Sequence, residues 1–223
     1  MTRRILYLVI VVFFFSSCKK DDGNGTVTDI DGNVYKTVVI GEQIWMAENL
    51  RVTKFNDGSD IKPVENNEEW RNTTTPAFSW YDNDSSLFGS KYGALYNGYS
   101  AHNNNVCPTG WHVPTDNEFL TLIETLGGTL AAGGKLKSND ILQWHTPNTG
   151  ADNSSHFAAL PAGMRYFEGT FSTATYFTGY WSSIEVNADT STFISLSYLN
   201  SKVILNEGSK NSGFSIRCVK NMQ

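Results

Sequence analysis

The 223-residue sequence is poor in cysteine and in positive charge. It has three cysteines and six prolines, and its 17 lysines and arginines face 22 aspartates and glutamates, which gives a formal net charge of −5. No basic block interrupts the chain. A nucleic-acid partner requires clustered positive charge to neutralise phosphates, so we expect neither DNA nor RNA to bind.

The chain also lacks a hydrophobic run long enough to span a membrane. Residues 5–15 are an unbroken apolar run, whereas a spanning helix needs roughly 18 such residues. A positive start before this run and a small Ser16-Ser17 pair after it are typical of a secretory signal. Because Cys18 follows that pair directly, the segment resembles the signal of a bacterial lipoprotein, with Phe15 where the usual pattern has leucine.

This resemblance implies a location. In that family the signal peptidase cuts before the cysteine, so residues 1–17 would be removed and Cys18 would carry the lipid that holds the protein on the membrane. Residues 18–25 are polar after the cysteine and predict a flexible tether. Within it, residues 19–22 resemble the surface-export signal of Bacteroidetes lipoproteins, which implies display on the outer membrane at the cell surface. A solvated stalk without a sorting role is the alternative.

The remaining cysteines form an even pair. With Cys18 assigned to lipid, an oxidising compartment favours a disulfide between Cys107 and Cys218. Two free buried thiols or two metal ligands are the alternatives, although no CxxC or Cys/His spacing supports a metal. A disulfide would close a loop of about 110 residues and stabilise the fold by roughly 4–5 kcal/mol.

Hydrophobic periodicity indicates a domain of the α+β class over residues 26–223. The Asp31-Gly32 turn between β-branched segments predicts a hairpin, and Thr115 with Glu118 predicts a capping box. Residues 213–219 alternate as a half-buried strand does. The expected elements are strands over 34–40, 43–46, 180–184, 192–198, 202–205 and 214–219, and helices over 116–126 and 129–136.

Seven phrases in order resemble the Fibrobacter succinogenes major paralogous domain, over roughly residues 29–220. The resemblance implies a C-type-lectin-like fold with short antiparallel strands, long loops and a disulfide to the last strand, a placement that Cys107 and Cys218 match. The family has no established activity, so a fold and a location are implied without a reaction. The phrases are DGNVY (31–35), GEQIWMAENLR (41–51), YGALYN (92–97), CPTGWHVPTD (107–116), FAALPAG (157–163), WSS (181–183) and GFSIRCV (213–219).

Motifs for metals and catalysis are weak. Residues 146–148 and 181–183 lack the carboxylates and amides that hold calcium in sugar-binding C-type lectins. We expect no cofactor; a structural calcium ion on residues 82–84 or 152–153 is a minor alternative to turn caps. The four histidines, at 102, 112, 145 and 156, show no metal-binding spacing, and no nucleophile elbow or phosphate loop is present. We therefore assign no catalytic residues.

Aromatic residues make up 13% of the chain and lie among Asn, Ser and Gly loops, a composition that adaptable binding surfaces use. Most aromatics anchor cores, so we expect only some to line a groove. The favoured function is a surface-anchored lipoprotein that binds an extracellular glycan or protein. A polysaccharide-active enzyme with an unrecognised site and a structural envelope protein are the alternatives. The candidate groove aromatics are Trp70, Trp80, Tyr81, Tyr176 and Tyr180.

Overall fold

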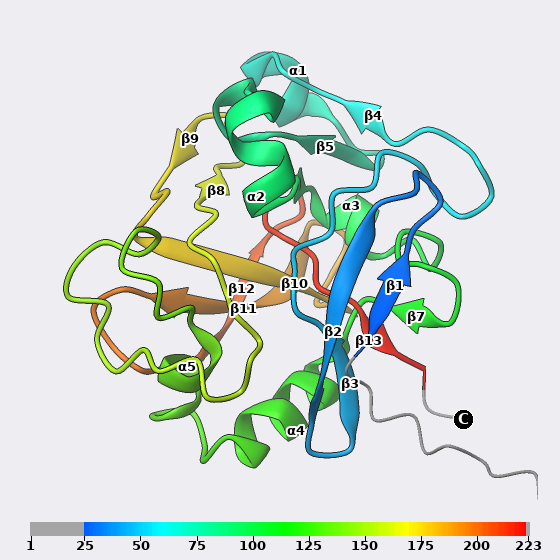
Figure 1. Ribbon diagram of the computed structural model, residues 1–223. Coiled ribbons are helices and arrows are strands. Elements are labelled where there is room, and N and C mark those ends of the chain that lie inside the picture. The colour runs from blue at the N-terminus through cyan, green and yellow to red at the C-terminus, as the bar shows by residue number, and fades with distance from the viewer. Residues whose placement is uncertain (1–24, 222–223) are drawn as a thin grey trace, which may run out of the picture.

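The computed structural model describes residues 25–221 and confirms the α+β class (Figure 1). Short strands and loops outweigh helices. No helix within these residues has the length and apolar character needed to cross a membrane. The expected signal segment 1–17 and the expected lipid site Cys18 lie outside the described residues, so both stay predictions.

The beginning and the end of the domain meet in one sheet (Figure 1). The predicted hairpin is confirmed, with Gly32 at φ +83° in the turn. The two strands that follow this turn have the predicted bounds. In spatial order the five strands are β1 (Thr26–Thr28), β2 (Val34–Ile40), β3 (Gln43–Met46), β13 (Val219–Lys220) and β7 (Trp111–His112).

A second sheet of three longer strands crosses the middle of the molecule (Figure 1). It is antiparallel and consists of β10 (Phe177–Glu185), β11 (Thr190–Ser197) and β12 (Ile204–Ser209). These strands overlap the predicted ranges. The short strands are β4 (Lys62–Pro63), β5 (Ala77–Ser79) and β6 (Leu95–Tyr96) in one small sheet, and β8 (Met164–Arg165) and β9 (Phe171–Ser172) in another.

The main helix, α4 (Asp116–Thr125), begins where the sequence predicted. The capping box is present: the Glu118 carboxylate accepts from the Thr115 backbone N–H at 2.8 Å, and Thr115 Oγ1 accepts from the Glu118 N–H at 3.3 Å. The predicted second helix is confirmed in a shorter form, α5 (Ala132–Leu136). The other helical segments are α1 (Asn67–Asn72), η1 (Tyr81–Asn83), η2 (Ser85–Gly89), α2 (Ser90–Tyr92) and α3 (Gly98–Ala101).

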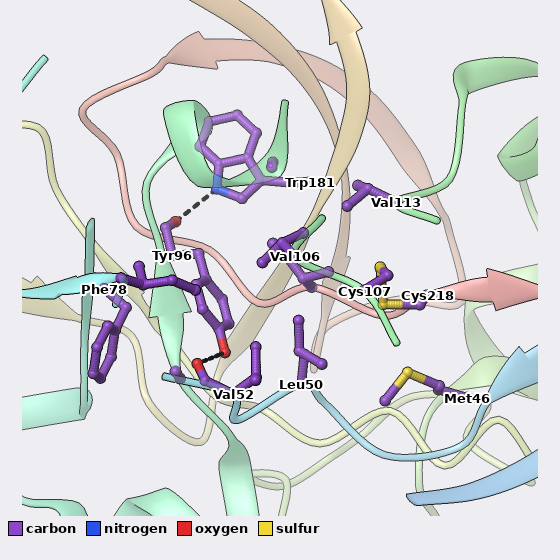
Figure 2. Packing of buried hydrophobic residues seen from close by; sticks show 14 of the residues in the cluster. Met46, Leu50, Val52, Phe78, Tyr96, Val106, Cys107, Val113, Trp181 and Cys218 are labelled. Atoms are coloured by element: carbon purple, nitrogen blue, oxygen red, sulfur yellow. Dashed lines mark hydrogen bonds between the residues drawn. A yellow bond between two sulfur atoms is a disulfide. The ribbon is translucent and has the colours of Figure 1, made fainter. Parts of the chain in front are cut away.

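Two hydrophobic clusters form most of the core. In the first, aromatic groups also satisfy their polar atoms: Trp181 Nε1 donates to the Tyr96 carbonyl and Tyr96 Oη to the Val52 carbonyl, each at 2.7 Å (Figure 2). In the second, Trp45 stacks on Phe119 of α4 with ring centroids 5.4 Å apart. Trp181 and Tyr96 are therefore buried without loss of hydrogen bonding at their polar atoms.

The prediction of a half-buried last strand is wrong. Residues 213–219 are buried on both faces, and only Val219 belongs to a regular strand of this segment, β13. Phe214, Ile216 and Cys218 join the first cluster, whereas Val219 joins the second. The segment lies between the two clusters, so neither face meets solvent.

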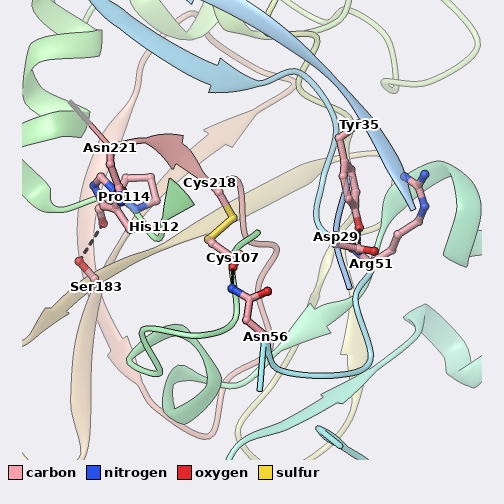
Figure 3. The surroundings of a disulfide bond; sticks show 10 residues. All are labelled: Asp29, Tyr35, Arg51, Asn56, Cys107, His112, Pro114, Ser183, Cys218 and Asn221. Carbon is pink, nitrogen blue, oxygen red and sulfur yellow. Dashed lines mark hydrogen bonds between the residues drawn. A yellow bond between two sulfur atoms is a disulfide. The ribbon is translucent and has the colours of Figure 1, made fainter. Parts of the chain in front are cut away.

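The disulfide between Cys107 and Cys218 is present and confirms the prediction (Figure 3). Both cysteines are buried, and the Asn56 side-chain amide donates to the Cys107 carbonyl. The bridge joins residues separated by 111 positions. It therefore fixes the loop before β7 to the segment that runs between the clusters.

The buried side chain of Arg165 holds loops through their backbone carbonyls rather than through carboxylates. Arg165 donates to the carbonyls of Val64, Glu65 and Gly169 and lies over the Trp70 ring at 4.4 Å. It forms no ion pair with any residue from 25 to 221. Burial lowers the pKa of Arg165 to about 10. Hydrogen bonds to the charged group compensate for its removal from water.

Lys137, which follows α5, binds a loop in the same way. Its ammonium group donates to the carbonyls of Thr149 at 3.0 Å and of Ser197 and Asn200 at 2.9 Å. These three bonds use all the donors of a lysine. Burial lowers the pKa of Lys137 to about 8. One side chain thus joins the end of β11 to the loop at residue 149.

We expect the Lys137→Met substitution to lower the free energy of unfolding by about 2–4 kcal/mol, because it removes three charge-assisted hydrogen bonds from buried carbonyls. Urea denaturation monitored by tryptophan fluorescence measures this change. The matched control is Lys135→Met, within α5 and two residues before Lys137, which we expect to change stability by less than about 0.5 kcal/mol. Equal effects of the two substitutions would contradict this role of Lys137.

Candidate ligand-binding hollow

An open hollow with a volume of about 400 Å³ lies between two parts of the chain. The β1–β2 turn and residues 51–53 face the segment 80–90 across it. This volume is within the range of small-molecule sites. One wall is polar and charged, and the other carries an aromatic ring among small residues. The lining residues are Asp31, Asn33, Arg51 and Thr53 on the first wall and Trp80, Ser85, Gly89 and Ser90 on the second.

The second wall depends on a π-helical turn, η2, against which the Trp80 ring packs. Asp84 caps this turn by accepting from the backbone N–H groups of Ser86 at 2.9 Å and Leu87 at 3.0 Å. A Cβ atom added at Gly89 would lie 3.3 Å from the Trp80 ring, so glycine lets the turn approach the indole. Single π-helical turns often accompany functional sites. The ring is half-buried and packs edge-to-face with Phe78, with ring centroids 5.5 Å apart, so it is fixed yet still accessible.

Arg51 on the first wall is positioned by a partly buried network (Figure 3). Its guanidinium lies 4.5 Å above the Tyr35 ring, Nε donates to Asn33 Oδ1 at 3.3 Å, and Nη2 donates to the Val34 carbonyl at 2.9 Å. The Tyr35 hydroxyl donates to Asp29 at 2.6 Å and accepts from the Arg51 backbone N–H at 3.0 Å. Burial and the bond to Asp29 raise the pKa of Tyr35, so this hydroxyl stays protonated.

Asp31 and Thr53 complete this wall. Asp31 Oδ2 accepts from the backbone N–H of Thr53 at 2.6 Å and from its hydroxyl at 2.8 Å. The contact ties the tip of the β1–β2 turn to the chain after Arg51. The hollow therefore presents an aromatic ring opposite a fixed cation, a carboxylate and the Thr53 hydroxyl, an arrangement suited to a polar ligand with an apolar face.

Of the five aromatics predicted to line a groove, Trp80 lies in the hollow. Trp70 and Tyr180 are core residues, with 1% and 0% of their surface exposed, so the prediction that they contact a ligand is wrong. Trp70 Nε1 donates to the Asn211 carbonyl at 2.6 Å, and the Tyr180 ring faces Arg217 at 5.2 Å. The Trp70 ring packs under Arg165 and the Tyr180 ring under Arg217, so both rings stabilise the interior, as aromatics in small cores commonly do.

Tyr81 and Tyr176 lie outside the hollow in other ring clusters. Tyr81 is half-buried between Phe88 and Phe171, at centroid distances of 5.0 and 5.4 Å. Tyr176 is 40% exposed and stacks on His145 at 4.6 Å. The structure thus does not bring the five predicted aromatics together into one groove.

Sequence reasoning missed the polar wall of the hollow. Residues 31–33 were interpreted as a turn and Arg51 as the end of a family phrase. No local pattern connects position 51 to position 80, because the contact depends on packing between distant segments. No local signal marked Arg51, which is separated from the end of β3 by residues 47–50 and lies far from Asp31 in the sequence.

A Ser–His–Glu series elsewhere has the residue types of a hydrolase triad. Ser191 Oγ lies 3.1 Å from His102 Nε2, and His102 Nδ1 lies 2.8 Å from Glu185 Oε1. Three features oppose catalysis. Ser191 has no exposed surface, the His102–Glu185 contact is not aligned as a hydrogen bond, and Lys210 already pairs with Glu185 at 3.0 Å. A nucleophile must reach its substrate, so these residues have a structural role.

We expect a fluorophosphonate probe to leave Ser191 unlabelled, because its hydroxyl is enclosed. Mass spectrometry of the probe-treated protein measures this directly. The Ser191→Ala variant is the control and should give the same result as the parent protein. A label that is present in the parent and absent from this variant would instead support the enzyme alternative.

The remaining histidines do not form a catalytic group with the hollow. His112 Nε2 contacts Glu118 Oε1 at 2.7 Å, and this hydrogen bond raises the pKa of His112. Burial opposes ionisation of Glu118, but its bonds from His112 and Thr115 together lower the pKa of this carboxyl. Since Glu118 also forms the capping box, the pair reinforces the start of α4. His156 is exposed, has a left-handed backbone conformation (φ +56°) and does not line the hollow.

Within residues 25–221, no group of three or more His, Cys, Asp or Glu side chains is arranged to hold a metal ion. Asp84 and Asp152, considered above for calcium, act instead as turn caps: Asp152 accepts from the Ser154 backbone N–H at 2.8 Å.

Comparison with known proteins places most of the chain in one family. The sequence profile of the Fibrobacter succinogenes major domain matches residues 38–220. This range contains both hydrophobic clusters except Tyr35 and includes the disulfide. No curated protein and no solved structure matches the chain.

Proposed function

Because the chain belongs to the Fibrobacter succinogenes major domain family, which has no established activity, we propose a function from its own surface: it binds an extracellular glycan in the Trp80 hollow. The observation that carries this proposal is a fixed, accessible indole facing charged and hydroxyl groups across an open volume of about 400 Å³. Sugars present C–H faces that pack on aromatic rings and hydroxyls that need hydrogen-bond partners. A protein ligand would use the same hollow less completely, because the hollow is small.

We further propose that the domain has a C-type-lectin-like arrangement. Three features support it: strands from both ends share a sheet, a disulfide reaches the final segment, and long loops lie between α5 and β10. In such a fold, loops carry the binding function on a rigid scaffold. The hollow follows this logic, since a turn and the η2 segment form its walls.

Lipid anchoring at the outer surface completes the proposal. The expected parts are a signal peptide over 1–17, a lipidated tether over 18–25 and the binding domain from residue 26 to 223. An anchored domain at the cell exterior meets polysaccharides directly, which fits an open hollow rather than an enclosed active site.

We expect the Trp80→Ala substitution to weaken glycan binding at least 10-fold, because truncating a central aromatic contact costs about 1.4 kcal/mol or more. The soluble domain, residues 19–223, is first screened on a glycan array, and affinities for the positive glycans are then measured by calorimetry. Phe167→Ala is the control, since Phe167 is 54% exposed and is not part of the hollow. Absence of binding to every glycan, or equal effects of both substitutions, would exclude this function for the hollow.

We expect labelled palmitate to enter the full-length protein through Cys18 in a host that makes Bacteroidetes-type lipoproteins. Cys18→Ser should remove the label and release the protein from membranes, because acyl chains supply the anchor. A Cys107→Ser, Cys218→Ser double variant should keep the label. Protease treatment of intact cells tests surface display; persistent label in Cys18→Ser, or full protection from protease, would contradict the anchor or the display respectively.

A further inference from the structure

The first wall of the hollow carries a cation and an anion that do not pair with each other. Arg51 forms no ion pair with any described residue, and the same holds for Asp31. Both side chains line the same open volume. Because no described side chain neutralises either charge, both groups are available to a ligand in the hollow.

Each of these groups also keeps unused hydrogen-bonding capacity. Arg51 donates through Nε and Nη2, while its Nη1 donates to no residue in the described part of the chain. Asp31 accepts two bonds through Oδ2, while Oδ1 accepts none from residues 25–221. The wall therefore offers a charged donor and a charged acceptor whose positions are already fixed by protein contacts. Such charge-assisted bonds are about twice as strong as neutral ones.

We propose that Arg51 and Asp31 recognise two neighbouring hydroxyls of an uncharged sugar ring. One hydroxyl accepts from Arg51 Nη1 and the other donates to Asp31 Oδ1, while a C–H face of the same ring packs on Trp80. A hydroxyl is both donor and acceptor, so a vicinal diol satisfies both groups at once. This inference rests on the proposed glycan-binding function and specifies the class of sugar that the hollow takes.

The charges of the wall disfavour acidic and basic sugars. A uronate carboxylate would gain Arg51 but would approach the exposed Asp31 carboxylate, and like charges at short distance repel. The protein's net charge of −5 adds to that repulsion. An amino sugar would meet the opposite conflict with Arg51. Only a neutral diol can bond to both Arg51 and Asp31 without placing a charge next to a charge of the same sign.

The position of Asp31 makes the inference testable without harm to the fold. Asp31 is exposed at the tip of a turn, and an asparagine there keeps an oxygen to accept from Thr53. Arg51 contributes more to its surroundings through Asn33 and Val34, so Arg51→Gln needs a check of thermal unfolding. The Asp31→Asn variant therefore carries the test if Arg51→Gln is destabilised.

The experiment uses hexasaccharide probes that differ in charge. Calorimetry on the soluble domain compares gluco-, manno-, xylo- and galacto-hexaoses with the hexamer of galacturonate, which matches the galactose ring except for its carboxylate. We expect a neutral hexaose to bind and the galacturonate hexamer to bind at least 10-fold more weakly than that hexaose. Asp31→Asn and Arg51→Gln should each weaken neutral binding about 10-fold, and Asp31→Asn should narrow the difference between neutral and acidic probes.

Matched charge controls are Glu42→Gln and Lys202→Gln, which remove one charge each at exposed positions that do not line the hollow. Neither should change the affinity. Tighter binding of galacturonate than of every neutral hexaose would overturn the inference, and so would unchanged neutral binding in Asp31→Asn while Trp80→Ala abolishes it. In both cases glycan binding itself would survive. Unchanged binding in Trp80→Ala would instead remove the proposed function.

Discussion

The fold depends most on the hydrogen bond between two buried side chains, Arg217 and Asn49, with Arg217 Nε donating to Asn49 Oδ1 at 2.7 Å. Arg217 belongs to the segment between the two hydrophobic clusters and also donates to the carbonyls of Phe157 and Ala158. Burial lowers the pKa of this guanidinium, and the hydrogen bonds compensate for its desolvation. One charged group thus joins the first third of the chain, the long loop at 157–158 and the C-terminal segment.

The same contact determines the positions of both walls of the hollow. Asn49 Nδ2 donates at 2.7 Å to the carbonyl of Tyr92, which ends α2, the helix that follows the Trp80 and η2 segment. Two residues after Asn49 comes Arg51, and Leu50 between them donates to the Ile216 carbonyl at 2.9 Å. At Gly93 a Cβ atom would lie 2.7 Å from the Asn49 side chain, so only glycine allows this approach. The opposing walls are therefore held by one buried centre, which limits their relative motion.

The sequence allowed the local structure to be predicted more fully than the site. The hairpin at Asp31-Gly32 and the capped helix from Asp116 were predictable because each depends on neighbours within a few positions. The disulfide followed from parity and compartment. By contrast, residues 213–219 alternate between apolar and polar side chains but are buried on both faces. Alternation identifies the buried face of a strand only when the other face is exposed to solvent. Trp80 was selected with four other aromatics, and nothing in the sequence distinguished it from buried Trp70 or joined it to Arg51.

Accessibility, rather than residue type, separates the two polar clusters of this protein. Ser191, His102 and Glu185 have the composition of a catalytic triad, yet the serine is enclosed and Lys210 neutralises the glutamate. Arg51 and Asp31 match no catalytic motif, but each keeps an unused polar atom beside an accessible indole. The buried cations Lys137, Arg165 and Arg217 all find hydrogen-bond acceptors in backbone carbonyls. In the proposed function, a ligand in the open hollow supplies partners for the two charges that no described side chain pairs.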